Sequence, residues 1–314
     1  MLESLMERSG MAEVVLRKVA TALGPVKKKL KKVIRGRSKS SISFQRDDTR
    51  INLLRSKLER SGIKDGDVVL IHSSLDGLRC LGLSAEEIVD FILDVFKKNT
   101  VVFASYPIEP NKKREIYKYD PKKTLCWTGM LPNVFLKREG VIRSEFPYNT
   151  LAAKGPLAID MMKENLKAEV PHGENTPWEF CRQHHAKILF LGTTSRESNT
   201  MAIHMIPDVM GKDWPIVGWY EERKYSIRIA DATVDKNIKV QKGFWYQYVN
   251  EYKNDKVLKD NGCLKDISFD GIPLEVVSDC WLMVDFLVER CKCGKLMYRI
   301  PRRFYKQRNG VVNK

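Results

Sequence analysis

The sequence predicts an α/β fold with a central mixed sheet and helices on both of its faces. Three short apolar runs support this prediction, at residues 67–72, 100–104 and 186–192. Runs of this kind, bounded by glycine or polar residues, are typical of buried strands. Because helical stretches separate them, the pattern indicates a sheet that is covered on both sides.

The remaining elements follow in chain order. Residues 51–61 have the spacing of an amphipathic helix, and Ser84 to Glu87 form a capping-box pattern that begins a second helix. We expect a third helix at 128–138. Later segments indicate antiparallel strands at 225–234 and 239–248, followed by one or two helices at 274–291.

The charge is concentrated at the two ends of the chain. The protein has 314 residues and a formal charge of +16; residues 1–50 hold 13 Lys/Arg and 5 Asp/Glu, and residues 289–314 hold 9 Lys/Arg and 1 Glu. The body between them has 33 of each and is neutral. A dedicated nucleic-acid binder usually carries its basic stripe on the folded face, so this distribution argues against nucleic-acid binding.

The N-terminal segment 11–34 combines an apolar stripe with a run of lysines. Met11, Val15 and Val19 recur at helical spacing, and Pro25 predicts a kink or a restart of the helix. Such a segment fits an anionic membrane surface, and it fits equally a helix packed on the body or on a second subunit. Residues 36–49 are expected to form a linker.

We therefore expect three parts: a basic amphipathic extension and linker at 1–50, a folded domain at 51–290, and a basic tail at 291–314. Seven cysteines without a CxxC pair favour a reducing cytoplasm over a disulfide scaffold. Since no apolar run is long enough to span a bilayer, we expect a cytoplasmic protein, with peripheral binding at the inner face of the membrane left open.

Hydroxyl residues and histidines follow the three predicted strands. They are His72 to Ser74, Ser105, and the stretch from Gly192 to His204. Ligands of open α/β sheets gather at the carboxyl ends of the strands, so these residues are the candidates for a site.

Six stretches, taken in order over roughly residues 51–290, resemble the motifs of the aminoglycoside 3-N-acetyltransferase family. Residues 66–75 resemble "GDxVlvHSSL", and residues 189–204 resemble "LLLG…nTxlHxxE". The other four stretches are residues 100–106, 119–129, 140–155 and 171–177.

The resemblance implies the family's α/β fold and an acyl transfer from acetyl-CoA, or another acyl-CoA, to an amino group, with no metal. The partners it implies are an amino-sugar or aminoglycoside substrate, and a homo-oligomer is left open. The residues that match the motifs and would contact the cofactor are Ser73, Ser74, Ser105, Arg143 and Ser144.

Acyl transfer needs a base for the attacking amine and donors for the oxyanion. His204 matches the histidine of the family's active site and is the predicted general base, while His72, after a buried strand, is ranked below it. Thr200 is a candidate donor. A second group normally orients the imidazole, and Asp208 and Glu197 are candidates for this role.

Three positions depart from the family pattern. Phe146 stands where the motif has His, Pro207 stands where it usually has Glu, and residues 80–83 replace a Gly-Gly pair. These departures affect the antibiotic substrate more than the acyl transfer.

Our main hypothesis is therefore an N-acyltransferase acting on an amino sugar, nucleotide-linked or part of a surface-glycan precursor, in a ternary complex. The alternatives are an aminoglycoside 3-N-acetyltransferase of antibiotic resistance and a non-catalytic binding protein with the same fold.

Overall fold

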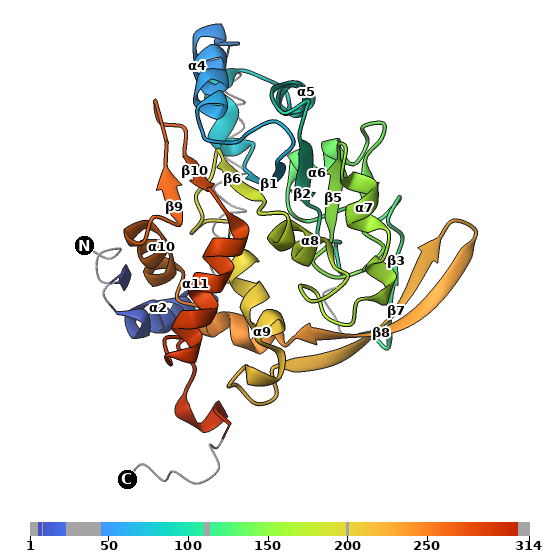
Figure 1. Cartoon of the computed structure of the whole chain (residues 1–314), viewed down its shortest axis with the longest axis vertical. Helices are drawn as coiled ribbons and strands as arrows, with labels where there is room; N and C mark the ends of the chain where they lie inside the picture. The colour runs from blue at the N-terminus through green and yellow to red at the C-terminus, as the bar shows by residue number, and fades with distance from the viewer. Residues whose placement is uncertain (1–5, 8, 23–44, 110–113, 199–200, 307–314) are drawn as a thin grey trace.

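The structure is a computed structural model that describes residues 6–7, 9–22, 45–109, 114–198 and 201–306. Its centre is a seven-stranded sheet in the order β4-β5-β2-β1-β6-β10-β9 (Figure 1). The three predicted strands are its middle: β1 (Val68–Ser73) lies between β2 (Thr100–Ala104) and β6 (Lys187–Leu191), parallel to both.

Antiparallel strands extend the sheet on both sides, which makes it the mixed sheet that the sequence predicts. Next to β2 lie β5 (Leu151–Lys154) and β4 (Ile142–Arg143). Next to β6 lie β10 (Leu274–Val277) and β9 (Leu264–Asp266).

The alternation of side chains along the middle strands creates two separate apolar cores. Val69, Ile71 and Phe103 point into one core, beneath α4 (Asp48–Glu59), α5 (Ala85–Val95) and α6 (Met130–Phe135). Val68, Leu70 and Phe190 point into the other. The helices that contribute to this second core include α7 (Ala158–Met162), α8 (Pro177–Gln183), α9 (Met205–Met210), α10 (Glu251–Asp260) and α11 (Cys280–Lys292). The expectation of helices on both faces is confirmed.

A second sheet of three strands lies beside the first: β3 (Ile116–Tyr119), β7 (Tyr220–Ile229) and β8 (Ala232–Gln241). The β7–β8 hairpin reaches away from the main sheet (Figure 1). Short 3₁₀ helices complete the chain at Asp76–Leu81 (η1), Asn165–Lys167 (η2), Met201–His204 (η3), Gly211–Asp213 (η4), Gly243–Tyr248 (η5) and Arg302–Phe304 (η6).

Several predicted boundaries are corrected. The third helix is α6, shorter than 128–138, and the second of the late strands, β8, ends at Gln241, after which 243–248 is helical. Residues 274–277 are not helical: all four are buried in β10 beside β6. Since a short, mostly apolar run has no periodicity that separates a helix from a strand, the sequence did not distinguish the two.

The N-terminal helix α2 (Gly10–Ala22) packs on the body of the protein. Val14 belongs to the second core, and the buried Glu13 carboxylate accepts hydrogen bonds from the backbone amides of Glu251 (2.7 Å) and Tyr252 (3.2 Å). This contact caps the N-terminus of α10 from another helix. Of the alternatives for this segment, the described part of the helix fits packing on the body. The lysine-rich residues 27–32 lie outside the described residues.

Residues 291–306, which we assigned to a basic tail, are packed against the body. Met297, Tyr298 and Ile300 are buried in the second core. Backbone bridges join Val249 to Tyr298 and Ile216 to Tyr305. The described part of the C-terminal segment therefore completes the domain.

Replacing Glu13 with alanine is expected to lower the free energy of unfolding by about 1–3 kcal/mol, because two amides at the start of α10 lose a buried charged acceptor. Urea unfolding of the full chain measures this. Val15→Ala, on the exposed side of the same helix, is the control and should change stability by less than about 0.5 kcal/mol. Equal effects for the two variants would contradict the capping role.

Candidate active site

His204 lies at the end of η3, where the chain passes into α9. Its side chain is buried, with 3% of the residue exposed. Nδ1 of the ring is hydrogen-bonded to the hydroxyl of Tyr298, and the ring of Tyr246 meets the imidazole edge-on at 5.1 Å. The predicted base is thus held between aromatic side chains from η5 and the C-terminal segment.

Asp208, one turn further along α9, pairs with a different histidine. Its Oδ2 accepts hydrogen bonds from the backbone amide and ring Nδ1 of His172, both at 3.0 Å. Its Oδ1 accepts a hydrogen bond from the hydroxyl of Tyr220 at 2.5 Å. Nε2 of His172 lies 3.2 Å from the amide of Asn149. The structure therefore places Asp208 as the orienting group of His172.

His172 is not among the site residues that the sequence predicts. The signal was available, because His172 lies in the stretch 171–177 that resembles a family motif. Its hydrogen-bond partners are Asn149 and Asp208, and no local spacing connects these positions. Chain topology alone brings them together.

Glu197, the other candidate for orienting the base, makes local contacts. Its carboxylate accepts from the Thr193 hydroxyl and the Thr194 amide, both at 3.3 Å. These bonds shape the turn after β6.

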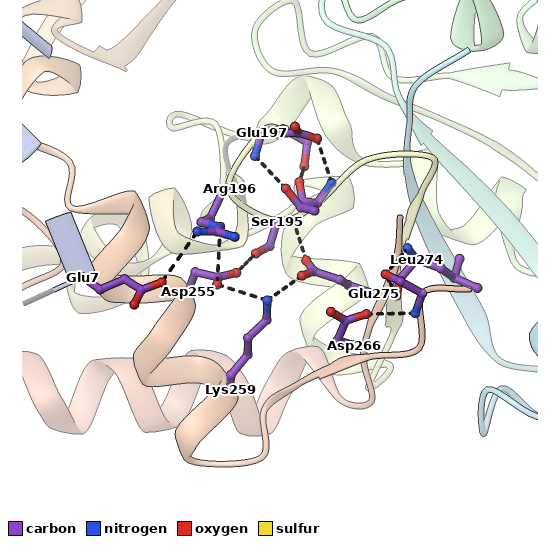
Figure 2. A network of polar contacts seen from close by, with 12 residues as sticks. Glu7, Ser195, Arg196, Glu197, Asp255, Lys259, Asp266, Leu274 and Glu275 are labelled. Atoms are coloured by element: carbon purple, nitrogen blue, oxygen red, sulfur yellow. Dashed lines mark hydrogen bonds and ion pairs between the residues drawn. The ribbon is translucent and has the colours of Figure 1, made fainter. Parts of the chain in front are cut away.

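A buried polar network fixes that turn to the rest of the protein (Figure 2). Ser195 donates its backbone amide to Glu275 of β10 at 2.6 Å and its hydroxyl to Asp255 of α10. Lys259 bridges the two carboxylates, at 2.6 Å from Glu275 and 3.2 Å from Asp255. Arg196 lies 3.7 Å from Asp255, and also 3.7 Å from Glu7 in the N-terminal segment. Ser195, nine residues before His204, is thus held through both its backbone amide and its side chain.

Four of the five residues predicted to contact the cofactor hold the loops at the strand ends. The Ser74 hydroxyl accepts from Gly77, and the Ser105 hydroxyl contacts Thr150. The Ser144 hydroxyl accepts from the Phe146 amide.

Arg143 is buried and donates to backbone carbonyls, including those of Ser105 and Thr124. Ser73 differs from the others, since its hydroxyl is buried without a partner among the described residues. Thr200 lies outside the described residues.

A close approach of two loops depends on glycine. A Cβ at Gly77 would lie 1.9 Å from the carbonyl oxygen of Gly192. The segment after β1 therefore packs directly on the segment after β6, although residues 80–83 depart from the family's Gly-Gly. Gly77 belongs to η1, so this 3₁₀ helix contacts the turn after β6.

The chain after β2 contributes several aromatic side chains. Burial and the nearby Tyr246 raise the pKa of Tyr106 well above its usual value, and its hydroxyl has no partner in the described part of the chain. Trp127, 65% exposed, meets the Tyr106 ring at 5.6 Å. Phe146 lies buried in a third apolar cluster with Tyr117 and Tyr225. The position of the family's histidine is therefore part of a core.

A separate open cavity of about 500 Å³ lies along β3 and β7. Neither His204 nor His172 lines it. Its lining residues are Lys118, Tyr119, Asp120, Lys123, Thr124, Ser226, Arg228 and Thr233.

Within the described ranges, no group of three or more His, Cys, Asp or Glu is arranged to hold a metal ion. Nor does any described helix have the length and hydropathy needed to cross a membrane.

Residues 70–273 match the family model described as aminoglycoside 3-N-acetyltransferase. The chain belongs to this family. Aminoglycoside N(3)-acetyltransferase IX of Micromonospora chalcea is 29% identical in an alignment of 148 residues that covers 42% of this chain. The alignment spans about half, 52%, of that curated relative.

Solved structures of the family share the fold. Apo AAC(3)-IVa is 16% identical and has a TM-score of 0.63, over 84% of this chain and 95% of that one. AAC-IIIb in a binary complex with CoASH is 17% identical and has a TM-score of 0.64, over 80% and 98% of the two chains. A mutant of AAC(3)-IVa in complex with a gentamicin also has a TM-score of 0.64 at 16% identity, over 85% and 95%. The fold class and family that the sequence indicates are confirmed.

His72, which we ranked below His204, is a buried core histidine. Its ring stacks on Phe190 at 5.2 Å, and burial lowers its pKa from 6.5 to about 4. The folded state therefore favours the neutral form of His72. Because the unfolded chain binds this proton at a higher pH than the folded protein does, the free energy of unfolding is unaffected above pH 6.5 and falls as the pH drops from about 6.5 to about 4.

We expect His72→Phe to abolish this part of the acid destabilisation, because Phe takes up no proton. A pKa lowered to about 4 corresponds to about 3 kcal/mol between pH 6.5 and 4. Urea unfolding at a series of pH values measures the slope. Parallel stability profiles of the variant and wild type over this range would refute the assignment.

Proposed function

We propose that this protein transfers the acetyl group of acetyl-CoA to an amino group of an aminoglycoside, with His204 as the general base. The observation that carries the proposal is the buried imidazole of His204, held at the end of η3 in a chain of this family. An acyl transfer from a thioester to an amine needs a group that takes the amine proton as the new bond forms. Imidazole suits this role near neutral pH.

The sequence favoured a nucleotide-linked amino sugar, with an aminoglycoside as the alternative. The family match and the curated relative, whose name is that of an aminoglycoside N(3)-acetyltransferase, support the alternative instead. Related structures also hold a gentamicin, sisomicin and apramycin. These ligands define the first substrates to try.

CoA is the expected co-substrate, since the related AAC-IIIb structure holds CoASH. Of the five predicted contacts, we assign the Ser73 hydroxyl as a donor to acetyl-CoA, because it is buried and has no partner among the described residues, and a buried hydroxyl is costly unless a ligand satisfies it. The other four support the binding loops through the hydrogen bonds described above. Thr200 remains a candidate oxyanion donor.

His204→Ala is expected to lower kcat by about 10²- to 10⁴-fold, because the attacking amine loses its proton acceptor. A thiol-release assay with acetyl-CoA and gentamicin, sisomicin or apramycin measures this. A parallel panel of nucleotide-linked amino sugars tests the other substrate class.

His184→Ala is the matched control, since His184 is exposed and stacks on Phe180 away from the site. Wild-type turnover with the aminoglycosides, unchanged in His184→Ala and lost in His204→Ala, supports the proposal. Turnover confined to nucleotide-linked amino sugars would overturn the substrate. No thiol release with either panel, together with no calorimetric binding of acetyl-CoA, would favour a non-catalytic protein.

A further inference from the structure

The partner of the His204 imidazole comes from a part of the chain that the family model does not match. Nδ1 of His204 is hydrogen-bonded to the hydroxyl of Tyr298, 94 residues further along, with ring centroids 5.9 Å apart. Tyr298 is 2% exposed and lies outside residues 70–273. The family's usual Glu position, three residues after the histidine, is Pro207, whose side chain has no hydrogen-bonding group.

Tyr298 is held rigidly on both sides. The backbone amide of Asn250 donates to Met297 at 3.0 Å, and that of Arg299 donates to Tyr248 at 2.7 Å. The rings of Trp219 and Trp214 meet the phenol edge-on, at 5.0 and 6.1 Å. The hydroxyl is therefore fixed before any substrate binds, as positioning of a catalytic group requires.

The phenol is neutral at every working pH. Burial raises the pKa of Tyr298 well above its usual value, and the nearby Tyr246, Asp208 and Cys291 act in the same direction. A neutral hydroxyl can accept a hydrogen bond from Nδ1–H of an imidazole. When it does so, the imidazole lone pair lies on Nε2.

We propose that Tyr298 is the positioning residue of the general base: its hydroxyl oxygen accepts the Nδ1–H hydrogen bond of His204 and so keeps the proton-accepting lone pair on Nε2. The proposal rests on the function proposed above. In the reaction, the N–C bond forms and the C–S bond breaks. The amine proton passes to Nε2 and from there to the departing CoA thiolate, so atoms and charge balance.

The tautomer can be measured directly in the wild-type protein by ¹⁵N chemical shifts of the histidine rings. With only five histidines in the chain, the His204→Ala spectrum assigns the signal. We expect His204 to carry its proton on Nδ1 above its pKa. A proton on Nε2 would overturn the proposal, whether or not the protein proves to be an acetyltransferase.

Tyr298→Phe provides the second arm, since it removes one oxygen and keeps the ring contacts. We expect kcat to fall about 10- to 100-fold with the KM for acetyl-CoA unchanged. The imidazolium loses a hydrogen-bond acceptor, so the His204 titration and the acid limb of kcat/KM should both move to lower pH by about one unit. The other titratable groups near the pair are Tyr246 of η5, Asp208 of α9 and Cys291 of α11, and the variant leaves them unchanged.

Tyr305→Phe, an equal change in the same C-terminal segment, is the control and should alter neither titration nor kcat. If Tyr298→Phe leaves both the His204 titration and kcat at wild-type values, Tyr298 has no positioning role. If the wild type transfers no acetyl group, the proposed function fails, and the ¹⁵N shifts with the NMR titration still decide the role of Tyr298.

Discussion

The double attachment of Ser195 is the interaction on which the site depends. Its amide and hydroxyl bind two buried carboxylates, Glu275 and Asp255, which Lys259 bridges. Charges removed from water are expensive, and such a network is tolerable only when every member is paired. Apolar side chains in place of these charges would stabilise the fold as well, but they would not fix the turn at Ser195 in one position. The network therefore contributes geometry more than stability, because it fixes where the segment to His204 leaves the sheet.

The C-terminal segment and η5 contribute to the same site. The segment after α11 brings Tyr298 to the imidazole, and η5 brings Tyr246. The loops of the site thus begin at the strand ends of the main sheet. The contacts that orient His204 come from mostly irregular segments in the last part of the chain. Loops on a rigid scaffold commonly carry function in this way.

Local sequence patterns predicted part of this arrangement. Short apolar runs indicate the three middle strands, a capping box indicates the start of α5, and a family motif indicates His204. The sequence predicts helix at residues 274–277, which form β10, and so short a run carries no period that distinguishes the two. The pairings of His204 with Tyr298 and of His172 with Asp208 join positions 94 and 36 residues apart. Only the folded chain brings such positions together, and the basic charge of the C-terminal segment concealed its buried residues.

A phenol as the partner of the base changes the electrostatics of the proposed reaction. A carboxylate bonded to Nδ1 would neutralise the imidazolium directly, whereas the Tyr298 hydroxyl offers only a dipole. A negative charge nearby is Asp208, which is bonded to His172 and Tyr220. Its influence is visible at both phenols beside the base, since it raises the pKa of Tyr298 and of Tyr246. Burial is the main cause that keeps these phenols protonated, and the negative charge of Asp208 acts in the same direction. A negative charge four residues further along the chain has the sign that favours a positive imidazolium at His204, whereas the hydrogen bonds of Asp208 hold His172.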